Sequence, residues 1–240
     1  MIKAEPRITE AFRTGQGMLW GEHDAGVFSG CERFFGPGYE QNLVPKWVPA
    51  LDGVQAKLER GATVADVGCG HGASTIILAR AFPRSRFVGF DNHSASIERA
   101  RRAALEASVS NATFEVAAAT DHPAPLSGYD LIAFFDCLHD MGNPVGALSH
   151  ASETLAEGGT VLLVEPQAGE RTEDNLNPVG RVYSGTSVLL CSPHAIAESG
   201  TALGTQATEQ TLRGVAESSG LSRFRKATET PFNRVFEARR

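Results

Sequence analysis

The chain has 240 residues, of which 42% are hydrophobic, and it carries a formal net charge of −6 at pH 7. This size allows one large domain with an ample apolar core, and no apolar run reaches the roughly 20 residues that span a bilayer. The acidic balance and the lack of a Lys/Arg block argue against broad binding to nucleic acid. We therefore expect a small-molecule partner, with no nucleic acid and no membrane.

The first residues and the cysteines indicate a cytoplasmic protein. The start of the chain mixes charges and lacks the apolar stretch of a secretory signal. The cysteines, which are Cys31, Cys69, Cys137 and Cys191, lie far apart and form no C-x-x-C pair. This spacing predicts reduced thiols rather than a zinc cluster or a disulfide framework. The histidines show no H-x-x-x-H spacing, so we expect no catalytic metal.

Residues 1–60 carry no strand pattern and indicate helices and turns. They hold an aromatic cluster composed of Trp20, Phe28, Phe34, Phe35, Tyr39 and Trp47. These rings either pack against the rest of the protein or form a lid over a ligand crevice, and the sequence leaves both interpretations open. We treat residues 1–60 as an N-terminal helical lid or accessory segment and residues 61–240 as the main, ligand-binding domain.

From Thr63 onward, strand patterns and helix patterns alternate. Strands are predicted over residues 63–68, 86–91, 112–118, 129–135 and 160–166. Helices are predicted over residues 73–82, 94–108 and 143–159, with Ser94 as the N-cap of the second. Such alternation predicts an α/β fold with a parallel, doubly wound sheet that has helices on both faces.

The end of the chain differs from this alternation. Residues 168–185 have the composition of a long polar loop, and long loops in compact domains tend to be functional. Residues 209–220 predict a helix closed by Gly220. Two extended runs, 223–230 and 232–239, follow with only Pro231 between them, which predicts an antiparallel hairpin at a sheet edge.

A glycine-rich motif, "VADVGCGHGAS", covers residues 64–74. Glycines after a strand let the backbone approach a nucleotide, and Asp91, 21 residues after Gly70, suits ribose hydroxyls. These features also fit a dinucleotide site, so a nicotinamide enzyme stays an alternative. Asp66 favours a different ligand, because a carboxylate inside the strand would repel a pyrophosphate and attract an ammonium group.

The fourth strand runs into a cluster of ionisable groups, "FFDCLHDMGNP", at residues 134–144. A ligand with a nucleoside at one end and an amino acid at the other matches all of these features. Asp91 would face the ribose, while Asp66 and the end of the fourth strand would lie near the amino-acid part. S-adenosylmethionine is such a ligand.

Four segments, "VADVGCGHGAS", "FVGFD", "YDLIAFFDCLHDM" and "LAEGGTVLLVEP", occur in the order and spacing of class I S-adenosylmethionine-dependent methyltransferases. From Gly61 to its end the chain resembles this family, and in particular actinobacterial small-molecule methyltransferases that contain "ERFFGPGY", "FFDCLHDMGNP" and "EDNLNPVGR". The resemblance implies a Rossmann-like fold with a seven-stranded sheet in the order 3-2-1-4-5-7-6 and strand 7 antiparallel. It also implies S-adenosyl-L-methionine as cofactor and S-adenosyl-L-homocysteine as product.

Two departures from the family pattern accompany this resemblance. Such relatives often carry a winged-helix domain before the matched region, and this chain has no room for one, so we expect a naturally short member or a trimmed chain. Many class I enzymes also place an acid beside the adenine just after strand three, where this chain has Ala118. Thr120 or Asp121 is expected to substitute, unless backbone contacts and stacking hold the adenine.

The residues predicted to bind the cofactor lie at the ends of the first four strands. They are Asp66, Gly68, Cys69, Gly70, Asp91, Asn92, Ala119, Thr120, Asp121, Phe135 and Asp136. Asp136 either accepts the ammonium group of the cofactor or caps a turn, and we favour the ligand role. Phe35, Tyr39 and Tyr183 are predicted to wall the substrate pocket, with ordinary packing as the alternative.

Methyl transfer requires a nucleophile in line with the sulfonium methyl group, and a hydroxyl or ammonium nucleophile also needs a base. His139 is the predicted base, because it follows the fourth strand and an unperturbed histidine titrates near pH 6.5. "LHDM" also resembles the "HDW" segment of small-molecule O-methyltransferases, whose histidine is the base, and Asp140 would orient it. Both residues could instead cap the next helix. Glu165 is interpreted as a solvated acid, with a role in orienting the base as the alternative.

The leading hypothesis is therefore methyl transfer to a small molecule of secondary metabolism, most readily at oxygen, with nitrogen and carbon left open. Methylation of nucleic-acid amino groups is disfavoured, since such enzymes carry D/N-P-P-Y/F after strand four. Two alternatives keep the cofactor: intramolecular cyclisation that releases methylthioadenosine, and a non-catalytic regulator that binds the cofactor. A homodimer is compatible with the apolar residues 183–191 or with the N-terminal segment.

Overall fold

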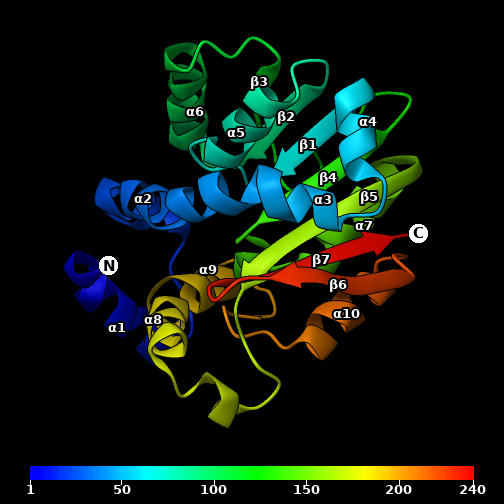
Figure 1. The fold of residues 1–240 in the computed structure, drawn as a ribbon. Coiled ribbons are helices and arrows are strands. Elements are labelled where there is room, and N and C mark those ends of the chain that lie inside the picture. The colour runs from blue at the N-terminus through cyan, green and yellow to red at the C-terminus, as the bar shows by residue number, and fades with distance from the viewer.

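The computed structural model describes residues 1–240, and a single seven-stranded sheet runs through its centre (Figure 1). The strands are β1 (Thr63–Val67), β2 (Arg86–Asp91), β3 (Ala112–Val116), β4 (Tyr129–Phe135), β5 (Leu155–Pro166), β6 (Arg223–Glu229) and β7 (Asn233–Arg239). Their order is β3-β2-β1-β4-β5-β7-β6, and only β7 runs antiparallel to its neighbours, β5 and β6. The predicted topology and the C-terminal hairpin are confirmed.

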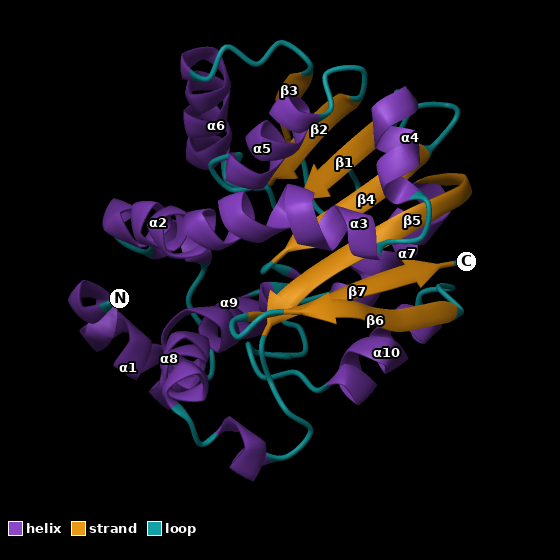
Figure 2. Ribbon diagram, in the orientation of Figure 1, coloured by secondary structure: helices purple, strands orange, loops and turns teal.

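Helices cover both faces of this sheet (Figure 2). They are α1 (Glu5–Thr14), α2 (Ala25–Asn42), α3 (Val48–Ala50), α4 (Val54–Arg60), α5 (Ala73–Ala81), α6 (Ser94–Glu106), α7 (Pro144–Thr154), α8 (Pro178–Thr186), α9 (Ser192–Ala197) and α10 (Glu209–Ser218). Shorter helical turns connect several of them. No helix is both long enough and apolar enough to cross a membrane.

The two faces of the sheet follow from the alternation of side chains along each strand. In β4, Leu131 and Ala133 pack into the core under α4 and α5, whereas Ile132 and Phe134 pack into the core under α7 and α10. All four side chains are almost fully buried. Because both faces are covered, the strand has no polar side and reads as a continuous apolar run.

Several helix and strand boundaries differ from the prediction, and three of these differences have a clear local cause. The N-cap of α6 is His93 rather than Ser94, and its side chain makes no capping hydrogen bond. α7 ends at Thr154 rather than near residue 159, because Leu155 is already extended and pairs with Tyr129 of β4. The predicted loop 168–185 contains α8, which begins at Pro178 after the Asn177 side chain accepts a hydrogen bond from the Gly180 amide.

The N-terminal residues 1–60 are helical, as predicted; α2 lies beside the carboxyl ends of the central strands, whereas α4 leads into the amino end of β1 (Figure 1). Trp47 and Leu58 are fully buried and pack into the core on the α5 face of the sheet. α1 contacts α9 instead, and Ile8 of α1 belongs to a small cluster with Met18, against which Leu189 packs. Among the aromatic residues of this segment, Trp47 packs in the core. Phe28, Phe34 and Phe35 on α2 instead line a cavity at the carboxyl ends of the central strands.

Candidate active site

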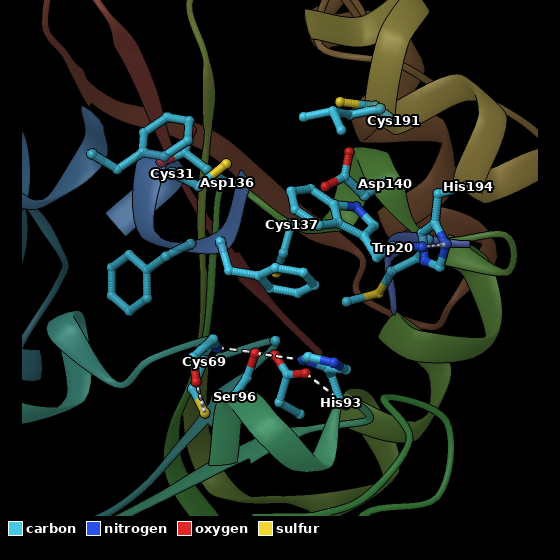
Figure 3. Close-up of a pocket in the computed structure, with 18 of the residues that line it drawn as sticks. Trp20, Cys31, Cys69, His93, Ser96, Asp136, Cys137, Asp140, Cys191 and His194 are labelled. Carbon is cyan, nitrogen blue, oxygen red and sulfur yellow. Dashed lines mark hydrogen bonds between the residues drawn. The ribbon is translucent and has the colours of Figure 1, made fainter. Parts of the chain in front are cut away.

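A cavity of about 780 Å³ lies at the carboxyl ends of β1, β2, β3 and β4. This is the point at which the strand order reverses from β1 to β4, where open α/β sheets bind their ligands. α2 covers one side of the cavity, and α8, α9 and the turn Ser187–Cys191 between them cover another. In Figure 3, Cys69, His93 and Ser96 lie at one end of the cavity, and Asp140 and Cys191 lie at the other.

The glycine-rich loop after β1 forms the wall at the first end. Gly68 and Gly70 both have left-handed φ values, of 74° and 53°. A Cβ at Gly68 would lie 2.8 Å from Cys137 Sγ, whereas a Cβ at Gly70 would meet nothing within 4 Å. The loop therefore packs tightly against Cys137 while Gly70 leaves room for a ligand.

Asp91 closes the same end, as predicted. Its carboxylate accepts hydrogen bonds of 2.9 Å from the amides of Gly70 and His93, and it lines the cavity. Burial raises the pKa of Asp91, and the two backbone hydrogen bonds lower it, with a net increase. The remaining predicted residues on this side, Asn92, Ala119 and Thr120, also line the cavity, together with Cys69.

Asp66 and Asp121 do not line the cavity, in contrast to the prediction. Asp66 is only 1% exposed, and its Oδ2 accepts hydrogen bonds of 2.6 Å from the hydroxyls of Ser74 and Thr75. Burial raises the pKa of Asp66 to about 6. Oδ2 thus fastens the first turn of α5 to β1, behind the glycine-rich loop, while Oδ1 has no hydrogen-bond partner.

His139 lies in the short helix Leu138–Asp140 after β4 and is 3% exposed. Its Nδ1 is 2.7 Å from Glu165 Oε2, and its Nε2 is 3.2 Å from Asp140 Oδ1. Burial lowers the pKa of His139, but the two carboxylates raise it more, so that the pKa lies well above its usual value. The structure thus brings the predicted base and Asp140 together in the cavity wall.

Glu165 is the residue for which the interpretation as a solvated acid was wrong. It is 1% exposed, and its carboxylate holds the His139 ring. β4 and β5 are parallel neighbours, and Phe135, the last residue of β4, pairs with Val164 near the end of β5. Residues that follow Phe135 therefore lie near Glu165, and this adjacency was the available signal.

Cys191, at the end of the turn Ser187–Cys191, joins His139 and Asp140 at the same end of the cavity (Figure 3). The ligand atoms of these three residues lie within 4.8 Å of one another. Burial raises the pKa of the Cys191 thiol to about 12. A cation at this point would compete with a proton for His139 Nε2, and the absence of a catalytic metal stays a prediction.

Asp136 connects three elements at the end of β4. Its Oδ2 accepts a hydrogen bond of 2.8 Å from the Tyr39 hydroxyl, and its Oδ1 accepts one of 2.8 Å from Asn233 Nδ2. Burial and the charge of Glu165 raise the pKa of Asp136 to about 8. Its φ of 51° is unusual for a residue other than glycine, and such strain persists only where the surroundings hold it. Asn233 was missed by sequence analysis because it comes from β7.

The predicted aromatic residues lie where they were expected. Phe35, Tyr39, Tyr183 and Phe135 all line the cavity. The rings of Phe35 and Tyr39 stack with their centroids 6.1 Å apart. The Tyr183 hydroxyl donates a hydrogen bond of 2.7 Å to the Phe232 carbonyl, which fixes the ring in the wall.

Two contacts that were not predicted tie α2 to the first end of the cavity. Glu32 Oε2 lies 2.7 Å from His71 Nδ1 in the glycine-rich loop. The ring of Phe28 stacks on His93, with centroids 4.5 Å apart and planes inclined by 17°. One polar and one aromatic contact thus hold α2 beside the glycine-rich loop and the end of β2.

A family model described as a methyltransferase domain matches residues 58–218. Among curated proteins, the trans-aconitate 2-methyltransferase of Afipia carboxidovorans is 29% identical over 103 residues, which are 43% of this chain and 38% of that protein. The 27-O-demethylrifamycin SV methyltransferase of Amycolatopsis mediterranei is 30% identical over 131 residues, which are 52% of this chain and 48% of that protein. The aligned segments thus cover less than half the length of these relatives.

Solved structures share the fold over nearly the whole chain. An O-methyltransferase family protein from Burkholderia thailandensis has a TM-score of 0.73 and 18% identity, with 99% of this chain and 68% of that chain covered. An O-methyltransferase from neocarzinostatin biosynthesis, in complex with S-adenosyl-L-homocysteine and 1,4-dihydroxy-2-naphthoic acid, has a TM-score of 0.66 and 19% identity. This likeness covers 97% of this chain and 66% of that chain.

Proposed function

The chain belongs to the methyltransferase domain family, and on this premise we propose that it transfers a methyl group from S-adenosylmethionine to an oxygen atom of a small-molecule metabolite. One observation supports an acceptor group that must lose a proton, such as a hydroxyl. A buried histidine, His139, lies between two carboxylates in the wall of a cavity at the carboxyl end of β4. A hydroxyl nucleophile needs such a base, because it must lose its proton as the methyl group arrives.

The first end of the cavity fits the cofactor. Gly70 leaves space beside the loop, and the Asp91 carboxylate lies against that space for the ribose hydroxyls. Ala117, Ala118 and Ala119 offer a small, apolar surface for a flat ring next to them. S-adenosylmethionine, when bound, supplies the electrophilic methyl group. The curated relatives and the solved O-methyltransferase named above also act on small molecules, which supports this choice of acceptor.

The chain's own residues would then perform two tasks. Phe35, Tyr39 and Tyr183 would hold the acceptor, so that its hydroxyl lies near His139. His139 Nε2 would accept the hydroxyl proton, while Glu165 would hold Nδ1 and stabilise the imidazolium that forms. Asp140, 3.2 Å from Nε2, would give way to the substrate oxygen or share the proton with it.

The test is incubation with S-adenosylmethionine, with and without a cell extract that supplies acceptors, followed by mass spectrometry. The proposal expects S-adenosylhomocysteine that forms only when the extract is present. Methylthioadenosine formed without extract would support cyclisation instead. Tight cofactor binding without turnover would support a regulator, and binding of NAD in place of S-adenosylmethionine would contradict the whole proposal.

A further inference from the structure

The wall of the cavity contains no Lys or Arg side chain. Five carboxylates line it: Glu32, Asp91, Asp136, Asp140 and Glu198. Apart from the rim residue Met1, whose α-amino group is a cation, histidine is the only residue type in the wall that can carry positive charge. Among the side chains of the wall, therefore, carboxylates balance or exceed every positive charge.

We infer that the methyl acceptor is a flat, apolar molecule with an uncharged hydroxyl, and that acceptors with a carboxylate are excluded. The inference rests on the proposed methyl transfer and specifies its substrate class. It requires that no histidine at the acceptor end of the cavity is available to pair with an anion, and the contacts of the four histidines decide this.

Two of the histidines are engaged by carboxylates. His139 has Glu165 at 2.7 Å on one nitrogen and Asp140 at 3.2 Å on the other. His71 has Glu32 at 2.7 Å. Any positive charge on these rings is already balanced within the protein.

Of the other two histidines, one is engaged by a carboxylate and one lies at the opposite end of the cavity. His194 Nε2 lies 3.5 Å from Glu198 Oε1, and its Nδ1 accepts a hydrogen bond of 3.3 Å from the Trp20 amide. His93, whose Nδ1 lies 2.8 Å from Ser96 Oγ, is at the end that fits the cofactor (Figure 3). A carboxylate at the acceptor end, beside His139, would therefore lose its hydration without gaining an unpaired cation.

Burying an unpaired charge costs several kcal/mol, and the Asp140 carboxylate would add repulsion at the reacting end. A neutral hydroxyl avoids both costs. We expect a preference of at least about 100-fold for a neutral acceptor over a carboxylate of the same size and shape.

The aromatic residues of the wall favour a flat molecule. Phe34 meets Tyr183 edge to face at a centroid distance of 6.4 Å, and Phe35 and Tyr39 stack at 6.1 Å. These two pairs present ring faces and edges from α2 and α8, to which an aromatic ligand can stack. Phe34 is partly exposed, so this part of the wall is reached from outside.

The experiment uses the protein saturated with S-adenosyl-L-homocysteine and titrates 2-naphthol and 2-naphthoate into it by calorimetry. These probes share a ring system and differ in charge. We expect 2-naphthol to bind at least about 100-fold more tightly. Equal or tighter binding of 2-naphthoate, or no binding of 2-naphthol, would overturn the inference.

A variant that adds a positive charge to the wall of the cavity provides a second test. Val182 on α8 lines the cavity but is 50% exposed, so Val182→Arg should fold. It is expected to strengthen 2-naphthoate binding at least about tenfold and to leave 2-naphthol nearly unchanged. Val188, 49% exposed and outside the wall, gives the control Val188→Arg, for which no change is expected. If Val182→Arg gains nothing for 2-naphthoate while the control behaves as expected, charge does not select the acceptor.

The calorimetry also distinguishes a failure of the proposed function from a failure of the inference about the acceptor. If S-adenosyl-L-homocysteine fails to bind, the proposed function falls, and the inference falls with it. If it binds and 2-naphthoate competes well with 2-naphthol, only the inference falls.

Discussion

Glu165 Oε2 lies 2.7 Å from His139 Nδ1, and both side chains are buried at the carboxyl ends of adjacent strands. This pair fixes the orientation of the imidazole and directs its other nitrogen toward Asp140. The catalysis proposed for this chain depends on this pair.

His139→Ala should lower turnover at least about a hundredfold, because the acceptor hydroxyl would lose its base. Binding of S-adenosylmethionine should stay within a few-fold, since His139 lies at the acceptor end of the cavity. Steady-state formation of S-adenosylhomocysteine and calorimetry measure the two quantities. An unchanged rate would remove His139 from the mechanism.

The rate should rise with pH, and its midpoint should lie above pH 6.5. Asp140 and Glu165 raise the pKa of His139 well above its usual value, and the ring must lose its proton before it can act as a base. Glu165→Gln removes one of these charges at nearly constant shape, so it should lower that pKa and move the ascending limb to lower pH. A pH–rate profile of both proteins decides this. A limb that stays in place or moves upward would contradict the assignment.

Glu32→Gln should speed the release of S-adenosylmethionine several-fold. The contact of 2.7 Å between Glu32 and His71 holds α2 against the glycine-rich loop, and the amide would hold it less strongly. Stopped-flow dissociation measures the rate. Glu40→Gln, on an exposed position of α2 outside the cavity wall, is the matched control and should behave as the native protein does. Equal rates in all three proteins would show that α2 is no lid.

The stability of the fold should fall in mild acid because of His122. Burial and the neighbouring His150 lower the pKa of His122 to about 4, and the unfolded chain titrates near 6.5. The unfolded state therefore binds more protons between these values. The contribution of neutral His122 to the free energy of unfolding is fully present above pH 6.5. It is lost as the pH falls toward 4, and the loss is on the order of 2 to 3 kcal/mol.

His122→Phe isolates this contribution, because His122 stacks on Phe90 with centroids 4.9 Å apart and its Nε2 has no hydrogen-bond partner. Urea unfolding at pH 7.5 and pH 5 should show a smaller acid loss in the variant than in the native protein. An equal loss in both would assign the acid sensitivity to other groups, such as His23, whose pKa is also lowered by burial.

Much of the fold follows from local patterns. The short apolar strands and the final hairpin predicted a doubly wound sheet with an antiparallel edge, because each strand has its own turn residues and apolar run. The order of the strands came only from the resemblance to class I methyltransferases. The end of α7 was placed too late, since Leu155 is extended only because β4 pairs with it. That pairing joins residues far apart in the sequence, and no local pattern records it.

The site was predictable only in part for the same reason. His139, Asp140, Asp91 and the glycines follow strands directly, so their meeting at one edge of the sheet could be inferred. Cys191 and Asn233 reach the site from later segments, and nothing in their local sequence points to it. Asp66 was misplaced because its partners, two hydroxyls at the start of α5, were not weighed against a ligand.

The most direct test follows a labelled methyl group. The native protein is incubated with S-adenosylmethionine that carries a CD3 group and with an extract that supplies acceptors, and His139→Gln is treated in parallel. Tandem mass spectrometry then locates the label. The account predicts a CD3 group on a hydroxyl oxygen of a small, uncharged acceptor, with at least about a hundredfold less in the variant. Label on a carboxylate, equal labelling by both proteins, or methylthioadenosine as the only product would contradict it.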